Sequence, residues 1–384
     1  MNLLSAFHKL CNNPGFILTV VLTLAIDTPF SIDCVAQTQP PDAPVPHLSE
    51  SELISATRQK LAQDTESGGF AGAVLIAHNG KPVFAQAYGL SDREHKIPNT
   101  IKSRFRIGSM NKMFTAVAIL QLAQQGRLGL DDPLGKYLTD YPNRDVATKV
   151  TIHHLLTHTG GTGDIFGPEF DAHRLELRTL QDYVKLYGNR GLSFEPGSRF
   201  EYSNYGFILL GAIVEKVSGE SYYDYVREHV YMPAGMTSTG SEPEESAVAG
   251  LSIGYTATGT ANGLRPNTGM LPYRGTSAGG GYSTVGDLLS FANAIQQDKL
   301  LNAHYTELLT VGKVVTPGGR IASAFADYSI NGIRCFGHAG GSIGMNGDLE
   351  VCPAPGYVVI VLANMDPPSA GLTSLFISSR LPEK

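Results

Sequence analysis

The sequence predicts an α/β (α+β) fold, in which an antiparallel sheet flanked by helices is built from both chain ends and carries an inserted, mainly helical lobe. Two apolar runs near the start, residues 71–77 and 83–88, are separated by Asn79-Gly80, and Asn-Gly between apolar runs is a strong hairpin signal. Three more strand-like runs lie near the end of the chain, and helical patterns occupy the middle. One sheet with an insertion is the simplest architecture that satisfies this order.

Each remaining element has its own signal. One apolar helix stops at Gly126 and another at Ser218-Gly219, because glycine commonly ends a helix. The unbroken apolar run of residues 357–364 predicts a strand at the centre of the sheet. The expected helices are residues 49–63, 109–125, 205–217 and 369–381, and the expected late strands are residues 335–340, 347–352 and 357–364.

The composition limits the class of protein. The chain has 384 residues, of which 42% are hydrophobic and 17% charged, as is usual for a folded globular protein. Its length suits two packed lobes better than one simple core. The formal net charge is −6 and no run of Lys or Arg stands out, so a nucleic-acid partner is not expected.

The first part of the chain predicts export. Lys9 precedes the apolar run of residues 16–26, which is too short to span a bilayer but suits a signal peptide, and Ala36 is a tolerable cleavage position. We therefore expect a signal peptide at residues 1–36 and a periplasmic or secreted protein with no stable membrane span. An uncleaved membrane anchor is the alternative. A proline-rich linker is expected at residues 37–47.

The rest of the chain divides into two expected lobes. Residues 48–134 and 266–384 form a discontinuous α/β lobe, and residues 135–265 form the helical lobe. Cys335 and Cys352 flank a glycine-rich turn, so an antiparallel pair of strands can place them opposite each other. They form either a disulfide, which an oxidising compartment permits, or two buried free thiols.

A serine and a lysine at the start of the expected helix 109–125 carry the first chemical signal. Ser109 and Lys112 are three positions apart, so hydroxyl and amine lie on one face of the helix within reach of each other. The amine can accept the hydroxyl proton if burial lowers its pKa, and the helix N-terminus directs N–H groups toward a developing oxyanion. By itself, Ser-x-x-Lys is more often a helix cap with a solvated lysine.

Two further motifs accompany this pair. Tyr202 and Asn204 are two residues apart in an extended segment, so both side chains can enter one cleft, where a phenol near a lysine can relay a proton. His338 lies on an expected strand and is followed closely by Gly340 and Gly341. A hydrogen-bonding residue followed by glycines that let a substrate approach the backbone is typical of a strand at the edge of a site.

Ser-x-x-Lys, Tyr-x-Asn and His-x-Gly in this order resemble the penicillin-binding protein and serine β-lactamase superfamily. The resemblance is closest to its branch of class C β-lactamases, DD-peptidases and esterase-like proteins, and it runs from about residue 50 to the end. The stretches at residues 155–161 and 279–288 also look similar to that branch. The resemblance implies a β-lactamase/DD-peptidase-like fold and an acyl-serine mechanism, with no metal and no organic cofactor.

The resemblance also implies a role for each motif residue. Ser109 would be the acylated nucleophile and Lys112 its base partner. Tyr202 would be the general base acting with Lys112, and would later protonate the leaving group. The remaining implied roles are substrate binding by Asn204, His338 and Gly340, and an oxyanion hole made by the backbone N–H groups of Ser109 and Gly341.

The third motif departs from the pattern in a way that bears on the substrate. Ala339 lacks the hydroxyl that Ser or Thr would offer to a substrate carboxylate. His338 is mostly neutral at pH 7 if its pKa is near 6.5, so it is a weaker anion anchor than Lys. We therefore expect DD-peptidase-like or esterase-like cleavage of an amide or ester in a peptide or small molecule. Class C-type β-lactamase activity is the alternative, and a non-catalytic penicillin-recognising sensor or scaffold is the second.

Other motifs are weaker. Ser277 and Ser342 each lie in Gly-x-Ser-x-Gly, but neither has both the hydrophobic strand before it and the helix after it that a nucleophile elbow needs. His153, His154 and His158 lack the spacing of a zincin and are expected to stabilise a loop near the cleft. The sequence does not indicate the oligomeric state.

Overall fold

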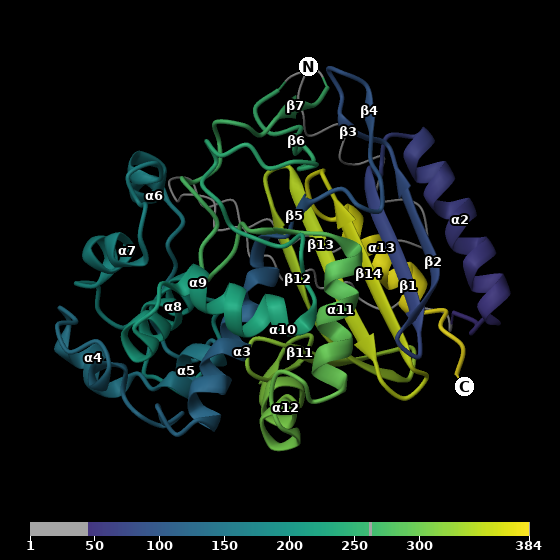
Figure 1. Ribbon diagram of the computed structural model, residues 1–384. Coiled ribbons are helices and arrows are strands. Elements are labelled where there is room, and N and C mark those ends of the chain that lie inside the picture. The colour runs from purple at the N-terminus through teal and green to yellow at the C-terminus, as the bar shows by residue number, and fades with distance from the viewer. Residues whose placement is uncertain (1–44, 261–262, 384) are drawn as a thin grey trace, which may run out of the picture.

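The computed structural model describes residues 45–260 and 263–383. Its centre is an antiparallel sheet of eight strands in the order β2-β1-β14-β13-β12-β11-β10-β9 (Figure 1). Strand β1 pairs with both β2 and β14, so early and late parts of the chain share one sheet. The strands are β1 (Gly72–His78), β2 (Lys81–Tyr88), β9 (Val314–Thr316), β10 (Gly319–Ile321), β11 (Ala326–Ile330), β12 (Ile333–Ser342), β13 (Met345–Cys352) and β14 (Tyr357–Ala363).

Strand β14 occupies the buried centre of this sheet, as its apolar sequence predicted. All of its residues are buried. Val359 and Val361 join the hydrophobic cluster on one face, whereas Ile360 and Leu362 join the cluster on the other. Full burial of each such side chain contributes about 1.5–3 kcal/mol. An unbroken apolar run is what a strand covered on both faces requires.

Helices cover both faces. On one face, α2 (Glu50–Glu66) and α13 (Ser369–Ser378) pack together, with α13 over β13 and β14. On the other face, α11 (Val285–Gln296) lies against β1 and β14. In Figure 1, α2 lies at the right of the sheet, whereas helices α4 to α9 gather at its left.

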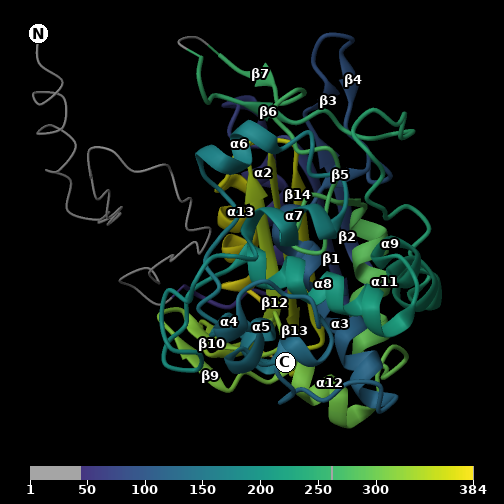
Figure 2. The ribbon, with the colours of Figure 1, turned by 90° about the vertical axis from the view of Figure 1, so that its left-hand side faces the viewer.

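The helical part of the molecule is organised around α3 (Asn111–Gln124) and α8 (Asn204–Ser218), which pack against each other. Ser203 caps α8, because its Oγ accepts from the N–H of Gly206, and Gly219 ends it with a φ of 80°. Figure 2 shows this group of helices in front of the sheet. The other helices are α4 (Arg144–Lys149), α5 (Ile152–Leu156), α6 (Pro168–His173), α7 (Leu180–Tyr187), α9 (Tyr222–Val226), α10 (Met232–Ala234) and α12 (Ala303–Thr310).

Short elements complete the fold. The β1–β2 connection is the expected tight hairpin, since Asn79 and Gly80 have φ values of 51° and 77°, as a type I′ turn requires. The helical turns are η1 (Gly108–Met110), η2 (Leu134–Lys136) and η3 (Arg227–Tyr231), and the minor strands are β3 (Leu90–Asp92), β4 (Ile97–Pro98), β5 (Phe105–Arg106), β6 (Tyr255–Thr256), β7 (Arg265–Pro266) and β8 (Tyr282–Ser283).

The predicted fold class is confirmed: an antiparallel sheet flanked by helices draws its strands from both parts of the chain. Some bounds differ. The helix expected from residue 109 begins as the separate turn η1, and α13 ends at Ser378. Strands β9, β10 and β11 were not predicted, because they are short and only partly buried and therefore carry little hydrophobic pattern. The boundaries of the two lobes stay predictions.

The beginning of the described chain is tied to its end. The signal peptide expected at residues 1–36, and all but the last three residues of the expected linker, lie outside the described residues. Asn331 Nδ2 donates to the carbonyl of Val45 at 2.7 Å, and His47 Nδ1 lies 2.6 Å from the carbonyl oxygen of Leu381. Within residues 45–260 and 263–383, no helix is both long enough and apolar enough to cross a membrane.

Candidate active site

Ser109 lies in the tight turn η1, which leads directly into α3. The side chain is half-buried, so it can still be reached from solvent. Gly108 before it has a φ of 50°, and a Cβ at this position would lie 2.8 Å from the backbone N of Gly341 on β12. Any side chain here would be strained and would collide with that strand. Glycine therefore allows the nucleophile turn to close onto β12.

Lys112, one helical turn further on, is completely buried. Its Nζ lies 3.2 Å from Ser109 Oγ, 2.7 Å from Asn204 Oδ1 and 2.5 Å from the carbonyl oxygen of Ala278. The last two partners are carbonyl oxygens, which only accept hydrogen bonds. A neutral amine in this place donates its two N–H groups to Asn204 and Ala278. Such an amine can also accept a hydrogen bond from the hydroxyl of Ser109.

The surroundings of Lys112 keep water away from its amine. Almost every residue of α3 is buried, because the helix is enclosed by α8, α9, α12 and η3. The Nζ also lies 4.7 Å from the ring centroid of Tyr202 and 5.5 Å from that of Phe207. Removal from water disfavours a charged amine, so burial promotes the form that can take a proton.

Tyr202 and Asn204 are brought to this lysine by the start of α8. Ser203 between them is the N-cap, so the backbone turns here from an extended segment into the helix. Tyr202 presents its ring to Lys112 from the extended side, and Asn204 presents its amide from the first helical residue. The structure thus places the side chains of the first two motifs in contact with one another.

Asp164 is a residue of this site that the sequence analysis missed. Asn204 donates from Nδ2 to Asp164 Oδ2 at 3.1 Å and from its backbone N to Oδ1 at 3.3 Å. The carboxylate is half-buried in the loop between α5 and α6. A single Asp in a glycine-rich loop has no characteristic spacing. The only sequence signal was its nearness to the stretch at residues 155–161.

His338 on β12 is neutral at physiological pH. Burial is the main cause that lowers the pKa of His338 to about 4. Its Nδ1–H donates to the carbonyl oxygen of Ala339, which leaves Nε2 as a hydrogen-bond acceptor. The expectation of a mostly neutral imidazole thus has a physical cause, because burial opposes protonation.

The two glycines after His338 face different surroundings. A Cβ on Gly340 would lie 2.0 Å from the carbonyl oxygen of Ile107. The side of Gly340 that lacks a side chain therefore faces the backbone just before Ser109 and not the solvent. Gly340 is buried, whereas Gly341 is half-buried. The expected oxyanion-hole residues, Ser109 and Gly341, therefore lie on two elements, η1 and β12, that are pressed together.

Other residues singled out from the sequence lie outside this arrangement. Ser277 is fully buried, and its side chain packs within 2.6 Å of the place where a Cβ on Gly211 of α8 would be, so it is not an accessible nucleophile. Cys335 and Cys352, on the paired strands β12 and β13, are joined by a disulfide. Among the described residues, no group of three or more His, Cys, Asp or Glu side chains is arranged to hold a metal ion.

Comparison with known proteins identifies the family to which this arrangement belongs. The Beta-lactamase family model matches residues 57–378, which is most of the chain. The chain belongs to the β-lactamase family. PbpX of Bacillus subtilis (strain 168) is 31% identical over 290 residues, covering 74% of this chain and 70% of PbpX. A penicillin-binding protein of the same organism is 38% identical over 175 residues, but the match spans only 38% of its length.

Solved structures of this superfamily resemble the present fold throughout. A penicillin binding protein from Bacillus halodurans has a TM-score of 0.73 and 33% identity, covering 80% of this chain and 96% of that one. A D-stereospecific amidohydrolase from Streptomyces sp. has a TM-score of 0.73 and 26% identity, covering 85% and 98%. Sequence and structure therefore agree on membership of the β-lactamase/penicillin-binding protein superfamily.

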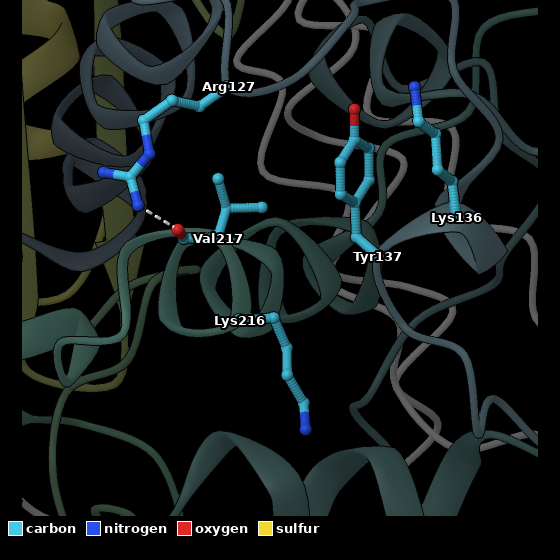
Figure 3. Close-up of a pocket in the computed structure, with 5 residues that line it drawn as sticks. All are labelled: Arg127, Lys136, Tyr137, Lys216 and Val217. Atoms are coloured by element: carbon cyan, nitrogen blue, oxygen red, sulfur yellow. Dashed lines mark hydrogen bonds between the residues drawn. The ribbon is translucent and has the colours of Figure 1, made fainter.

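A surface hollow elsewhere on this β-lactamase-family chain does not form a second site (Figure 3). It measures about 430 Å³ and is lined by Arg127, Lys136, Tyr137, Lys216 and Val217. Its cations do not converge: Arg127 donates to the carbonyl of Val217, Lys136 pairs with Asp132 at 2.8 Å, and Lys216 extends away from the others. The three cations of this hollow therefore do not point at one common position where a ligand could bind them together.

Proposed function

We propose that this protein is an exported serine hydrolase that cleaves an amide or ester through an acyl-Ser109 intermediate, with DD-peptidase-like or esterase-like specificity. One observation carries the proposal: the buried Lys112 Nζ lies 3.2 Å from Ser109 Oγ and also contacts the carbonyl oxygens of Asn204 and Ala278. A buried amine in hydrogen-bond contact with the hydroxyl can take its proton when the amine is neutral. A solvated lysine beside a helix cap would not be buried in this way.

The reaction follows from these positions. The Ser109 hydroxyl gives its proton to Lys112 while Oγ bonds to the substrate carbonyl carbon. The N–H groups of Ser109 and Gly341 stabilise the oxyanion. Tyr202, whose ring adjoins the lysine, passes a proton to the leaving amine or alcohol. Water then attacks the acyl-Ser109 ester, and the same groups return the protons, which regenerates the hydroxyl.

The third motif bears on the choice of substrate. A neutral His338, followed by Ala339 without a hydroxyl, offers no strong anchor for a carboxylate. Penicillins present a carboxylate at this place, so class C-type β-lactamase activity is the less favoured alternative. The likeness to a D-stereospecific amidohydrolase supports amide cleavage as one branch of the proposal.

The activity should rise through neutral pH, when Lys112 or Tyr202 becomes a competent base. His338 does not contribute to this rise, because its pKa of about 4 lies well below the neutral range. A rate that is flat between about pH 5 and 9 would contradict this assignment of the base.

Active-site labelling tests the proposal directly. Purified protein is treated with a fluorophosphonate probe, and mass spectrometry locates the adduct, which we expect on Ser109 and not in Ser109→Ala. Ser277→Ala is the matched control, since it removes the buried hydroxyl of the Gly-x-Ser-x-Gly segment at residues 275–279 and should label normally. An unlabelled wild type would instead favour a sensor or scaffold. A panel of p-nitrophenyl esters, a D-Ala-D-Ala peptide and nitrocefin then separates esterase, peptidase and β-lactamase activity.

A further inference from the structure

The loop at residues 157–164 runs alongside the Tyr-x-Asn motif and contacts its residues in turn. The carbonyl of His158 accepts from the backbone N of Glu201 at 2.9 Å, and its Nδ1 accepts from the backbone N of Ser203 at 3.1 Å. Thr162 Oγ1 lies 3.0 Å from Ser203 Oγ. Two hydrogen bonds from one residue therefore hold the backbone on both sides of Tyr202.

The ring of His158 also lies against the phenol that it brackets. It stacks on the ring of Tyr202 with centroids 4.4 Å apart and planes 27° apart, and it contacts Phe207 at 5.0 Å. Because Nδ1 accepts a hydrogen bond, the neutral ring carries its proton on Nε2. Complete burial holds the pKa of His158 well below its usual value. The imidazole thus acts as a flat neutral support.

Asp164 decides which end of the Asn204 amide faces the lysine. A carboxylate only accepts hydrogen bonds, so the Asn204 group 3.1 Å from it must be the Nδ2 donor. Oδ1 is then the group that faces Lys112 at 2.7 Å. In the reversed orientation, Nδ2–H would donate to the lone pair of Lys112. That lone pair would no longer be directed at Ser109, and the lysine could not take the serine proton.

We propose that the loop at residues 157–164 is the positioning element of the active site, in which Asp164 fixes the amide of Asn204 and His158 fixes the ring of Tyr202. The inference rests on the proposed function, because it concerns how Lys112 is kept ready to accept the Ser109 proton. Neither residue needs to touch the substrate. Both act through the residue that each one holds.

Asp164→Asn is the decisive variant. The substituted amide has the shape of the carboxylate but can present either oxygen or nitrogen, so the amide of Asn204 is free to reverse. We expect the maximal rate of fluorophosphonate inactivation to fall roughly 100-fold, as for a misplaced catalytic group, while the half-saturating probe concentration stays unchanged. Asp171→Asn is the matched control, since Asp171 is an exposed acid on α6 and should leave both constants unchanged.

The pH profile distinguishes positioning from a merely structural role. The titratable or charged groups around Lys112 are Tyr202, His158, His338 and, beyond Asn204, the carboxylate of Asp164. Loss of that carboxylate disfavours the ammonium form of the lysine, and a reversed amide requires the neutral form. The rising limb of the inactivation rate should therefore move to lower pH in Asp164→Asn while its plateau falls. A structural defect would lower the plateau without moving the limb.

His158→Asn tests the second contact. Asn tolerates the φ of 56° at this position and offers an acceptor to the N–H of Ser203, but it has no ring to support Tyr202. We expect an inactivation rate about tenfold lower, with thermal unfolding close to that of the wild type. His173→Asn on the exposed surface of α6 is the control.

The outcomes separate the two levels of the argument. A wild type that forms no Ser109 adduct would overturn the proposed function and this inference together. A labelled wild type with unchanged rates in Asp164→Asn and His158→Asn would overturn the inference alone. Reduced rates with an unmoved limb in Asp164→Asn would also overturn it, since they would show only local damage.

Discussion

Gly340 offers a sharp test of how closely the third motif must approach the nucleophile. A Cβ at this position would lie 2.0 Å from the carbonyl oxygen of Ile107, whereas real Cβ contacts essentially never fall below 3.0 Å. In Gly340→Ala the two segments must therefore separate by about 1 Å, the difference between these values. The separation displaces Gly341 N–H relative to Ser109. A misplacement of about 1 Å costs roughly 100-fold in rate.

The assay measures function and stability side by side. We expect the inactivation rate by a fluorophosphonate, and kcat/KM for a p-nitrophenyl ester, to fall roughly 100-fold in Gly340→Ala. Overpacking should also lower the free energy of unfolding by about 1–3 kcal/mol, measured by urea denaturation. The fall in rate must therefore be separated from the loss of stability.

Gly72→Ala provides that separation. A Cβ on Gly72 of β1 would lie 2.0 Å from the carbonyl oxygen of Leu362, which is the same overlap with the same kind of atom. Two strands, β14 and β13, separate β1 from β12. We expect Gly72→Ala to be destabilised to a similar degree but to keep its rate per folded molecule. Equal rates in Gly340→Ala and Gly72→Ala would refute the reasoning.

Two further predictions concern charge. His338→Lys should raise the ratio of kcat/KM for a D-Ala-D-Ala peptide to kcat/KM for a p-nitrophenyl ester about fivefold or more. A cation about 4 Å from a carboxylate gains about 1 kcal/mol even at the dielectric constant of water. An unchanged ratio would contradict the proposal that the third motif lacks an anchor for a carboxylate. Asp348 is buried on β13, and burial, then Glu350, hold its pKa well above the usual value. The unfolded chain releases this proton near pH 4 but the folded chain keeps it up to its raised pKa, so folding stability falls by about 1.4 kcal/mol per pH unit between these two points. Urea denaturation between about pH 5 and 9 should show a shallower decline for Asp348→Asn, and parallel declines would count against the assignment.

Sequence patterns predicted the parts of this fold whose residues are periodic. The run at residues 357–364 became the central strand β14, and Asn79-Gly80 became the hairpin turn. Both signals are local: an apolar run reports burial on two faces, and Asn-Gly tolerates positive φ. Strands β9 to β11 were missed because they are short and partly exposed. Their pairing depends on β12, which no local pattern encodes.

The candidate site shows the same division. Ser109, Lys112, Tyr202 and Asn204 were found because motif spacing reflects the local geometry of α3 and of the start of α8. Asp164 was not, because its contact with Asn204 joins residues 40 positions apart. A lone Asp in a loop gives no indication of which distant amide it will orient. The disulfide was left open for a related reason, since only the register of β12 and β13 decides whether the two thiols meet.

The position of Lys112 explains why so many separate segments are needed. A buried amine must have its hydrogen-bonding groups satisfied, and here the acceptors come from the start of α8 and from the segment that contains Ala278. Each acceptor is itself held in place: Asn204 by Asp164, and Ala278 by the bond from its N–H to Thr276 Oγ1 at 3.2 Å. The fold thus places two acceptor-only oxygens so that the remaining lone pair of the amine faces the serine. If either acceptor is lost, the lysine stays buried, but its amine is no longer held in the orientation that suits proton transfer from Ser109.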